Sequence, residues 1–140
     1  MIKVLLYVWQ LPQNLLGLLV ILFTHADNTD KGYWLSYYHN FGVALGSYII
    51  FGGVGSMLDT NVKHEQGHQK QSLYLGPLYL LIIGLPSITG NIISRIKFRF
   101  SDKSSQIKIK IIKWYYNLPW EKWADKLGGV NRGMINRSLI

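Results

Sequence analysis

The clearest chemistry in this chain of 140 residues lies in five consecutive positions. His64, Glu65 and His68 follow the pattern His-Glu-x-x-His. On an α-helix, residues four positions apart project from the same face, so the two imidazoles can bind one metal ion. Glu65 then lies beside that ion, where its carboxylate can take a proton from a water molecule. Two nitrogen ligands, a carboxylate and one open position suit Zn²⁺, so we expect a single zinc ion.

The third ligand must come from another part of the chain. The remaining histidines, His25 and His39, both precede the motif, and Tyr74 occupies the position where a longer zinc motif has its third histidine. We therefore expect a carboxylate that follows the motif. Three are available, namely Asp102, Glu121 and Asp125.

Two of these carboxylates lie on one short segment, 119–127. Pro119 is favoured in the first turn of a helix, and Gly128-Gly129 is typical of a helix end. Four apolar residues at helical spacing form the predicted buried stripe, namely Trp120, Trp123, Ala124 and Leu127. A helix over this segment would place Glu121 and Asp125 on a neighbouring face.

Carboxylates four positions apart on a helix repel each other unless a cation lies beside them. We predict that Glu121 binds the metal and that Asp125 orients one histidine through its other ring nitrogen. The alternative is a solvated face on which both acids pair with Lys122 and Lys126.

The histidine motif needs a helix of its own. Asp59-Thr60-Asn61 offers side chains that cap a helix, and Gly76-Pro77 would end it, which predicts a helix over 60–75. The preceding segment 41–58 is apolar but contains five glycines and a β-rich centre. We favour a strand with glycine-rich turns over a membrane helix in 41–58.

Other apolar segments suggest contact with a membrane. Residues 4–23 approach the length of a bilayer span, and polar residues interrupt them at Gln10, Gln13 and Asn14. A spanning anchor, an interfacial helix and a cleaved signal peptide remain open, and Thr24-His25-Ala26 is a poor cleavage site, which favours an uncleaved anchor. Segment 78–93 is broken by Gly84, Pro86 and Gly90, which fits a hairpin, a re-entrant turn or shallow helices.

Composition and charge agree with a membrane protein. The chain is 49% hydrophobic and 16% charged, and a soluble domain carries about 25% charged residues. The whole excess of +8 lies in residues 71–140, mostly in 95–113, which suits an anionic lipid surface. No nucleic-acid motif is visible, so nucleic acid is not an expected partner. Without cysteine, the chain has neither a disulfide scaffold nor a thiolate metal site.

These patterns predict an α+β fold that is mostly helical. We expect a membrane anchor or interfacial helix in 1–23, a domain in 24–130 with a membrane-lying segment 73–93, and a loose tail in 131–140. Residues 24–40 read as a polar loop. The alternating segment 107–111 reads as a strand or a surface-lying stretch.

The two motifs together resemble those of the gluzincin metallopeptidases. The first is His64-Glu65-x-x-His68, and the second, Glu121-x-x-Ala124-Asp125, precedes Lys126-Leu127-Gly128. The chain is most similar to the membrane-bound CAAX prenyl endopeptidase type, in a minimal form. The resemblance implies a small zincin-like fold, with a zinc ion on both histidines and Glu121.

The resemblance also implies Glu65 as general base and a strand around 44–51 that aligns the substrate backbone. The chain departs from these enzymes in its small size. It also lacks a histidine after the motif that could stabilise the oxyanion. Three residues are candidates for that role, namely Tyr115, Tyr116 and Arg132.

We therefore expect a membrane-associated zinc endopeptidase that hydrolyses peptide bonds with a metal-activated water. Its partners would be membrane lipid and a peptide or protein substrate, and its location a bacterial inner membrane. One alternative is a catalytically inactive metal-binding membrane protein that acts as an interaction partner, and another is a small accessory subunit without a metal. His64 and Glu121 can share an ion only if the chain between them crosses the bilayer an even number of times.

Overall fold

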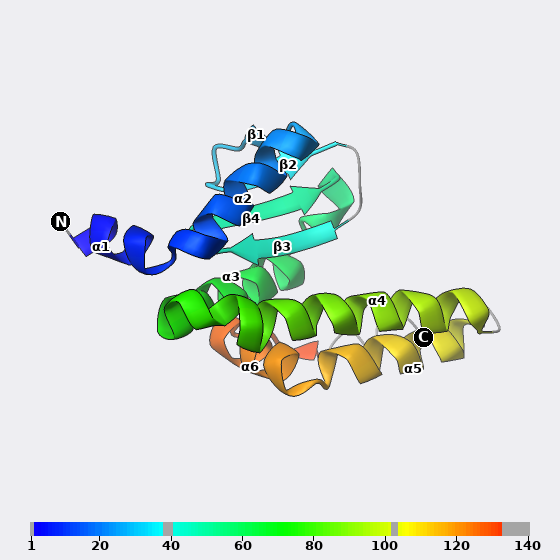
Figure 1. The fold of residues 1–140 in the computed structure, drawn as a ribbon. Helices are drawn as coiled ribbons and strands as arrows, with labels where there is room; N and C mark the ends of the chain where they lie inside the picture. Colours follow the sequence, from blue (N-terminus) through cyan, green and yellow to red (C-terminus); the bar gives the residue numbers. More distant parts are fainter. Residues whose placement is uncertain (1, 38–40, 102–103, 133–140) are drawn as a thin grey trace.

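The structure is a computed structural model that describes residues 2–37, 41–101 and 104–132 (Figure 1). The described part is mostly helical with one small four-stranded sheet, so the α+β prediction is confirmed. Helices α1 (Ile2–Trp9) and α2 (Leu11–Thr24) precede the strands β1 (Asp27–Asn28), β2 (Trp34–Ser36), β3 (Phe41–Leu45) and β4 (Tyr48–Gly52). The chain continues through η1 (Val54–Ser56), α3 (Asp59–Leu75), η2 (Gly76–Leu78), η3 (Leu80–Gly84), α4 (Leu85–Phe100), α5 (Ser105–Tyr116) and α6 (Pro119–Gly128).

The sheet lies between two helices. Helix α2 covers one face, and α3 covers the other, with α4, α5 and α6 beyond it (Figure 1). Alternate residues of β4 face opposite layers: Ile50 packs with Ile21 of α2, and Ile49 and Phe51 pack in a second cluster with Val62 of α3. Both faces of β4 are therefore buried, which explains its continuous apolar sequence.

The segment 41–58 forms strands, as predicted, because β3 and β4 are the two arms of an antiparallel hairpin. Gly46 in the turn has a positive φ of 61°, a conformation that suits glycine. The strand order β1-β2-β4-β3 places β3 at one edge and β4 inside. The substrate strand predicted around 44–51 is therefore wrong in its bounds, since the exposed edge is Phe41–Leu45.

The polar residues that interrupt the first apolar segment are buried. Gln10, Gln13 and Asn14 are at most 2% exposed. The Gln13 amide donates to Ser72 Oγ and to the carbonyl of Gly76, which joins α2 to the end of α3. Asn14 Oδ1 accepts from the backbone N–H of Ser47 in the hairpin turn. These side chains therefore hold α2 against both the sheet and α3.

Several local predictions were wrong. The expected loop 24–40 contains β1 and β2, and β2 pairs in parallel with β4, a long-range contact. The segment 107–111, expected to be a strand or a surface-lying stretch, is not a strand: it lies within α5, whose start is capped by Ser104 and which has no buried residue. Helix α3 begins at Asp59 after Leu58, which has no capping side chain.

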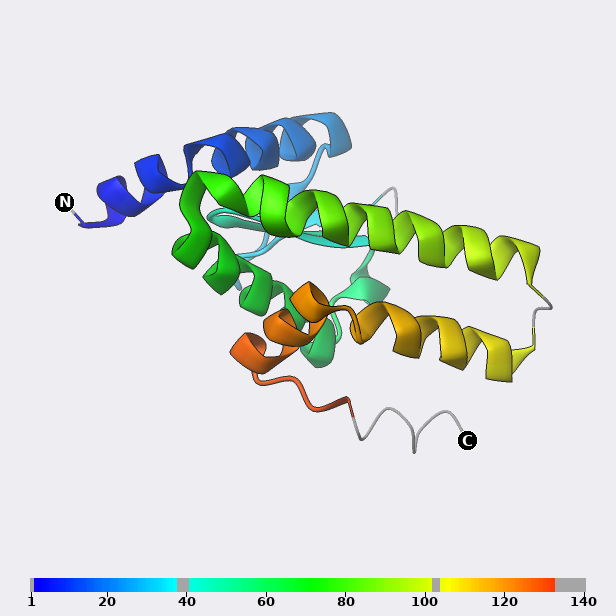
Figure 2. The ribbon, with the colours of Figure 1, turned by 60° about the horizontal axis from the view of Figure 1, so that its bottom comes forward.

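The expected break in segment 78–93 is also absent. The chain is helical from Leu80 to Phe100, because the π-helical turn η3 continues directly into α4, whose second residue is Pro86. This helix is long and apolar enough to cross a membrane and is mostly exposed. Helices α1 and α2 together pass the same test, but they are bent by 81°. Helices α4 and α5 form an antiparallel hairpin (Figure 2).

Helices α3 and α6 approach each other closely at two glycines. A Cβ atom on Gly67 would lie 1.9 Å from the carbonyl oxygen of Ala124, and one on Gly128 would lie 1.9 Å from the carbonyl oxygen of Lys63. Neither position can carry a side chain without moving the opposite backbone. The two glycines therefore set the distance between the helices.

We predict that Gly67→Ala separates α3 from α6 and lowers the free energy of unfolding by about 1–3 kcal/mol or more. Thermal and urea unfolding measure this loss. Gly55→Ala is the control, since a Cβ atom there meets nothing within 4 Å. Equal stability of both variants would contradict the close approach.

Candidate metal centre

Three buried donor atoms from α3 and α6 converge on one point. His64 Nε2 lies 3.0 Å from Glu121 Oε2, and His68 Nε2 lies 3.3 Å from the same oxygen. The two imidazole nitrogens are 3.2 Å apart. The helical spacing predicted that both histidines would share a face, and the structure brings the predicted third ligand, Glu121, to the same point, where it is completely buried.

This triangle has the size that a metal ion requires. Tetrahedral zinc with bonds near 2.0–2.1 Å separates its ligand atoms by about 3.3 Å. The three observed distances lie within 0.3 Å of that value. The residues present therefore fit a small divalent cation. Asp102, the remaining candidate carboxylate, lies outside the described residues.

The outer nitrogens of both imidazoles are bonded as well. His64 Nδ1 lies 2.6 Å from Asp125 Oδ1, which places Asp125 where the sequence predicted a partner for one histidine. His68 Nδ1 lies 2.7 Å from Gln71 Oε1, and the Gln71 amide donates to the carbonyl of Trp120. With Nδ1 engaged, each ring presents Nε2 to the common point. Sequence reasoning missed Gln71, although its spacing of three from His68 was a usable signal.

Glu121 is positioned by a hydroxyl group that the sequence did not reveal. Ser87 of α4 donates to Glu121 Oε1 at 2.6 Å, and Ser87 Oγ is also 3.2 Å from the Tyr115 hydroxyl. This bond leaves Glu121 Oε2 directed at the histidines. No spacing in the sequence links position 87 to position 121, because the contact depends on how α4 packs beside α6.

Glu65 lies between the candidate metal site and the edge strand. Its carboxylate accepts a hydrogen bond from the backbone N–H of Ala44, and burial raises its pKa. A Cβ atom on Gly42 would lie 2.9 Å from Glu65 Oε1, so a side chain at this position would displace the carboxylate from its place. The motif glutamate thus faces the strand that an extended peptide could join.

The remaining predicted residues are divided between two sides of the site. Tyr115 and Tyr116 line the cleft beside the histidines. Arg132 does not line this cleft, because its guanidinium pairs with Asp125 and lies 3.3 Å above the Tyr116 ring. Lys122 and Lys126 form no ion pair with either acid among the described residues, so the alternative of a solvated, paired face is wrong.

The positive and negative groups of the site stabilise each other's charge. Burial by itself would lower the pKa of His64, but hydrogen bonds to Asp125 and Glu121 raise it to about 9. Burial likewise works against charge on Glu121, and its bonds to His64 and His68 hold its pKa well below the usual range. The buried Glu121 carboxylate is therefore ionised and paired with the cationic imidazole of His64. A bound metal cation would replace the charge of that imidazole.

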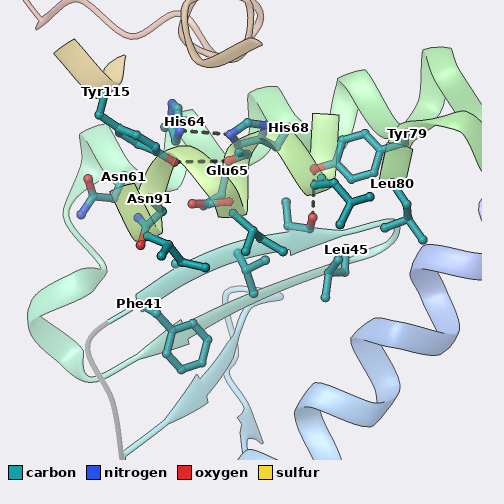
Figure 3. A pocket seen from close by; sticks show the side chains of 18 of the residues that line it. Phe41, Leu45, Asn61, His64, Glu65, His68, Tyr79, Leu80, Asn91 and Tyr115 are labelled. Atoms are coloured by element: carbon teal, nitrogen blue, oxygen red, sulfur yellow. Dashed lines mark hydrogen bonds between the residues drawn. The ribbon is translucent and has the colours of Figure 1, made fainter. Parts of the chain in front are cut away.

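A cleft of about 560 Å³ opens beside this site (Figure 3). The edge strand β3 forms one wall, and residues of η3 and α4 form the opposite wall. His64, Glu65 and His68 lie along it (Figure 3). The candidate site is therefore open to a ligand along the length of β3.

No protein-family model matches this chain, and no curated protein or solved structure matches it significantly.

We predict that one zinc ion binds per chain and that Glu121→Ala weakens zinc binding by at least 100-fold, because it removes one of three donors. Metal analysis of the purified protein and chelator competition measure both quantities. Glu121→Gln, which keeps the size of the side chain, is the matched variant and should also lose affinity. Unchanged zinc affinity in both variants would rule out Glu121 as a ligand.

Zinc affinity should also rise with pH. Below pH 9 a proton on His64 competes with the ion, so the apparent binding constant should increase about tenfold per pH unit between pH 7 and 8.5. Chelator competition across this range gives the slope. Asp125→Asn weakens the bond that raises this pKa and should flatten the slope. A binding constant that does not change with pH would show that His64 carries no competing proton.

Proposed function

We propose that this chain is a membrane-associated, zinc-dependent endopeptidase of the gluzincin type. The observation that carries the proposal is the triangle of His64, His68 and Glu121 donors beside a buried Glu65 carboxylate that faces a free strand edge. Metal ligands, a base and a surface for an extended backbone are the three parts that hydrolysis of a peptide bond requires.

His64, His68 and Glu121 would hold the ion. Once bound, zinc would lower the pKa of a water molecule and polarise the carbonyl of the substrate. Glu65 would take the proton of that water and pass it to the leaving amine. Burial raises the pKa of Glu65, which makes its carboxylate a better proton acceptor.

The free edge of β3 would align the substrate. The N–H of Ala44 bonds to Glu65, and its carbonyl accepts from the Tyr79 hydroxyl, so the polar backbone groups of Ala44 face the cleft. An extended peptide would add as a further strand on the part of this edge whose backbone groups are not bonded to Glu65 and Tyr79. Antiparallel pairing is slightly more stable per residue, so we place the peptide antiparallel to β3.

Two tyrosines would bind a developing oxyanion. Tyr115 and Tyr116 line the cleft next to the histidines, and burial raises the pKa of both hydroxyls. Both groups therefore stay protonated and can donate a hydrogen bond near neutral pH. Arg132 is bonded to Asp125, so we leave it out of this role.

The proposed membrane location is supported by exposed apolar side chains. Large apolar side chains are exposed along α1, α2, η3 and α4, including Leu5, Phe23, Leu81 and Ile96. Lys97 and Arg99 lie in the last turn of α4, which suits anionic lipid. Because α4 and α5 form an antiparallel hairpin, the chain returns to α6, where Glu121 meets the histidines. This return agrees with the requirement that both motifs lie on the same side of a bilayer. We propose a bacterial inner membrane as the location.

The decisive experiment is Glu65→Gln. We expect this variant to keep its zinc and to lose peptide hydrolysis by at least 1,000-fold, because the amide cannot accept the proton. Zinc content and cleavage of a mixture of apolar-rich peptides, followed by mass spectrometry, are measured on the full chain in detergent.

His68→Ala is the control that loses both the metal and the activity. Cleavage that persists in Glu65→Gln would remove Glu65 from the mechanism. Zinc binding without cleavage of any peptide or protein by the native chain would favour the inactive metal-binding alternative.

A further inference from the structure

The hairpin formed by α4 and α5 carries a dense positive charge. Its described residues, 85–101 and 104–116, include six basic side chains and no acidic one. These six, here called the basic cluster, are all exposed: Arg95, Lys97, Arg99, Lys108, Lys110 and Lys113. None of them forms an ion pair within the part of the chain that the structure describes. The hairpin therefore offers a group of cations to a partner from outside the chain.

Two cation–π contacts join the basic side chains of the two helices. Lys97 Nζ lies 3.5 Å from the centre of the Trp114 ring, and Lys108 Nζ lies 5.8 Å from the centre of the Phe98 ring. An ammonium group above a ring still has hydrogens that can bond to a phosphate oxygen. The turn end of the hairpin also extends beyond the sheet and α3 (Figure 1 and Figure 2). The basic cluster is thus held together and projects away from the rest of the fold.

An exposed apolar stripe runs along η3 and α4 and ends at the basic cluster. Five side chains, each at least 50% exposed, follow one another at spacings of three or four residues: Leu81, Leu85, Ile88, Ile92 and Ile96. This spacing places them on one side of a helix. Arg99 continues the same row, and the helical repeat places Arg95 and Lys97 on either side of it. An apolar stripe bordered by bases is typical of a helix that lies in the interface between lipid and water.

The position of α5 determines how this stripe can meet a bilayer. The helix from Leu80 to Phe100 is long and apolar enough to cross a membrane. However, α5 lies antiparallel beside α4, so a crossing would carry the three lysines of α5 towards the hydrocarbon core, where charged side chains are costly. The stripe from Leu81 to Ile96 also covers only about 22 Å, whereas that core is about 30 Å thick. Both observations favour a helix that lies along the bilayer.

We propose that the α4–α5 hairpin lies along the surface of an anionic bilayer, where the basic cluster binds the phosphate groups of the lipids and the apolar stripe enters the acyl layer. This inference rests on the proposed membrane location and not on hydrolysis. It names the partner, an anionic phospholipid surface, and it fixes the orientation of α4. Because Ser87 of α4 bonds to Glu121, the same helix would hold the candidate metal site beside the lipid surface.

Vesicle flotation tests the lipid preference. The full chain is added from dilute detergent to vesicles of phosphatidylcholine, either alone or with about one third phosphatidylglycerol. We expect the partition coefficient to be at least about tenfold higher for the anionic vesicles and to fall as the salt concentration is raised, because salt screens the attraction. Equal binding to both kinds of vesicle, or a preference that salt leaves unchanged, would overturn the inference.

Substitutions then assign the preference to the hairpin. Replacing the three lysines of α5 together by glutamine should weaken binding to anionic vesicles by about 100-fold, since each base near such a surface contributes about fivefold. The matched control removes the same charge outside the hairpin, at three exposed lysines: Lys31, Lys122 and Lys126. Thermal unfolding checks that both triple variants are folded. A preference that survives in the α5 variant, or that falls equally in the control, would overturn the inference.

Fluorescent labels measure the orientation of α4. The chain has no cysteine, so Leu81→Cys and Ile96→Cys each provide one labelling site, at the two ends of the apolar stripe. Quenching by lipids that carry spin labels at different depths should place both fluorophores at the same shallow depth, in the leaflet to which the protein was added. Fluorophores in opposite leaflets would show that α4 crosses the bilayer and would overturn the inference.

Lipid binding and hydrolysis can fail separately. If the chain cleaves no peptide but binds anionic vesicles through the lysines of α5, the peptidase function fails and the lipid surface stands. If the chain binds neutral and anionic vesicles equally, the membrane location stands and the basic cluster is not a lipid site. If the basic cluster binds an RNA oligonucleotide and the chain binds no vesicle, the membrane location and the inference both fail, and the partner is a nucleic acid.

Discussion

The contact between α3 and α6 is the constraint on which the rest of the site depends. Gly67 and Gly128 let the backbones touch, and only at that distance can Glu121 reach both imidazoles of α3. Gly67, which lies between the two histidines of the His-Glu-x-x-His motif, is therefore needed for the packing of α3 against α6. The sheet and α4 are arranged around this helix pair, so the cleft depends on it too.

Close packing also buries a charged carboxylate, and hydrogen bonds from the surrounding side chains offset the cost of its desolvation. A fully buried carboxylate beside two imidazoles is costly unless every polar atom has a partner. Asp125 and Gln71 satisfy the outer nitrogens of the histidines, and Ser87 satisfies one oxygen of Glu121. Arg132 in turn pairs with Asp125. The remaining lone pairs point inward, to the place where a cation would stabilise the whole cluster.

Much of the local structure could be predicted, because it depends on neighbours in the sequence. Helix α6 begins at Pro119 and ends at Gly128, and Gly129 follows it in a left-handed conformation, as its sequence indicated. The alternation of Ile and Lys in 107–111 suggested a strand, but packing against α4 and the Ser104 cap produce a helix there. The strands in 24–40 were missed because β2 is stabilised by β4, which follows much later in the chain.

The sequence by itself determined the donor atoms and their first arrangement, because a spacing of four on a helix places His64 and His68 on one face. It also reduced the third ligand to three carboxylates, of which Glu121 was the one predicted. Only the tertiary structure decided that Glu121 completes the triangle, that Gln71 and Ser87 orient the ligands, and that β3 is the free edge. These features join distant residues, such as His68 and Glu121, which are 53 positions apart, and such contacts follow from helix packing and strand order rather than from local periodicity.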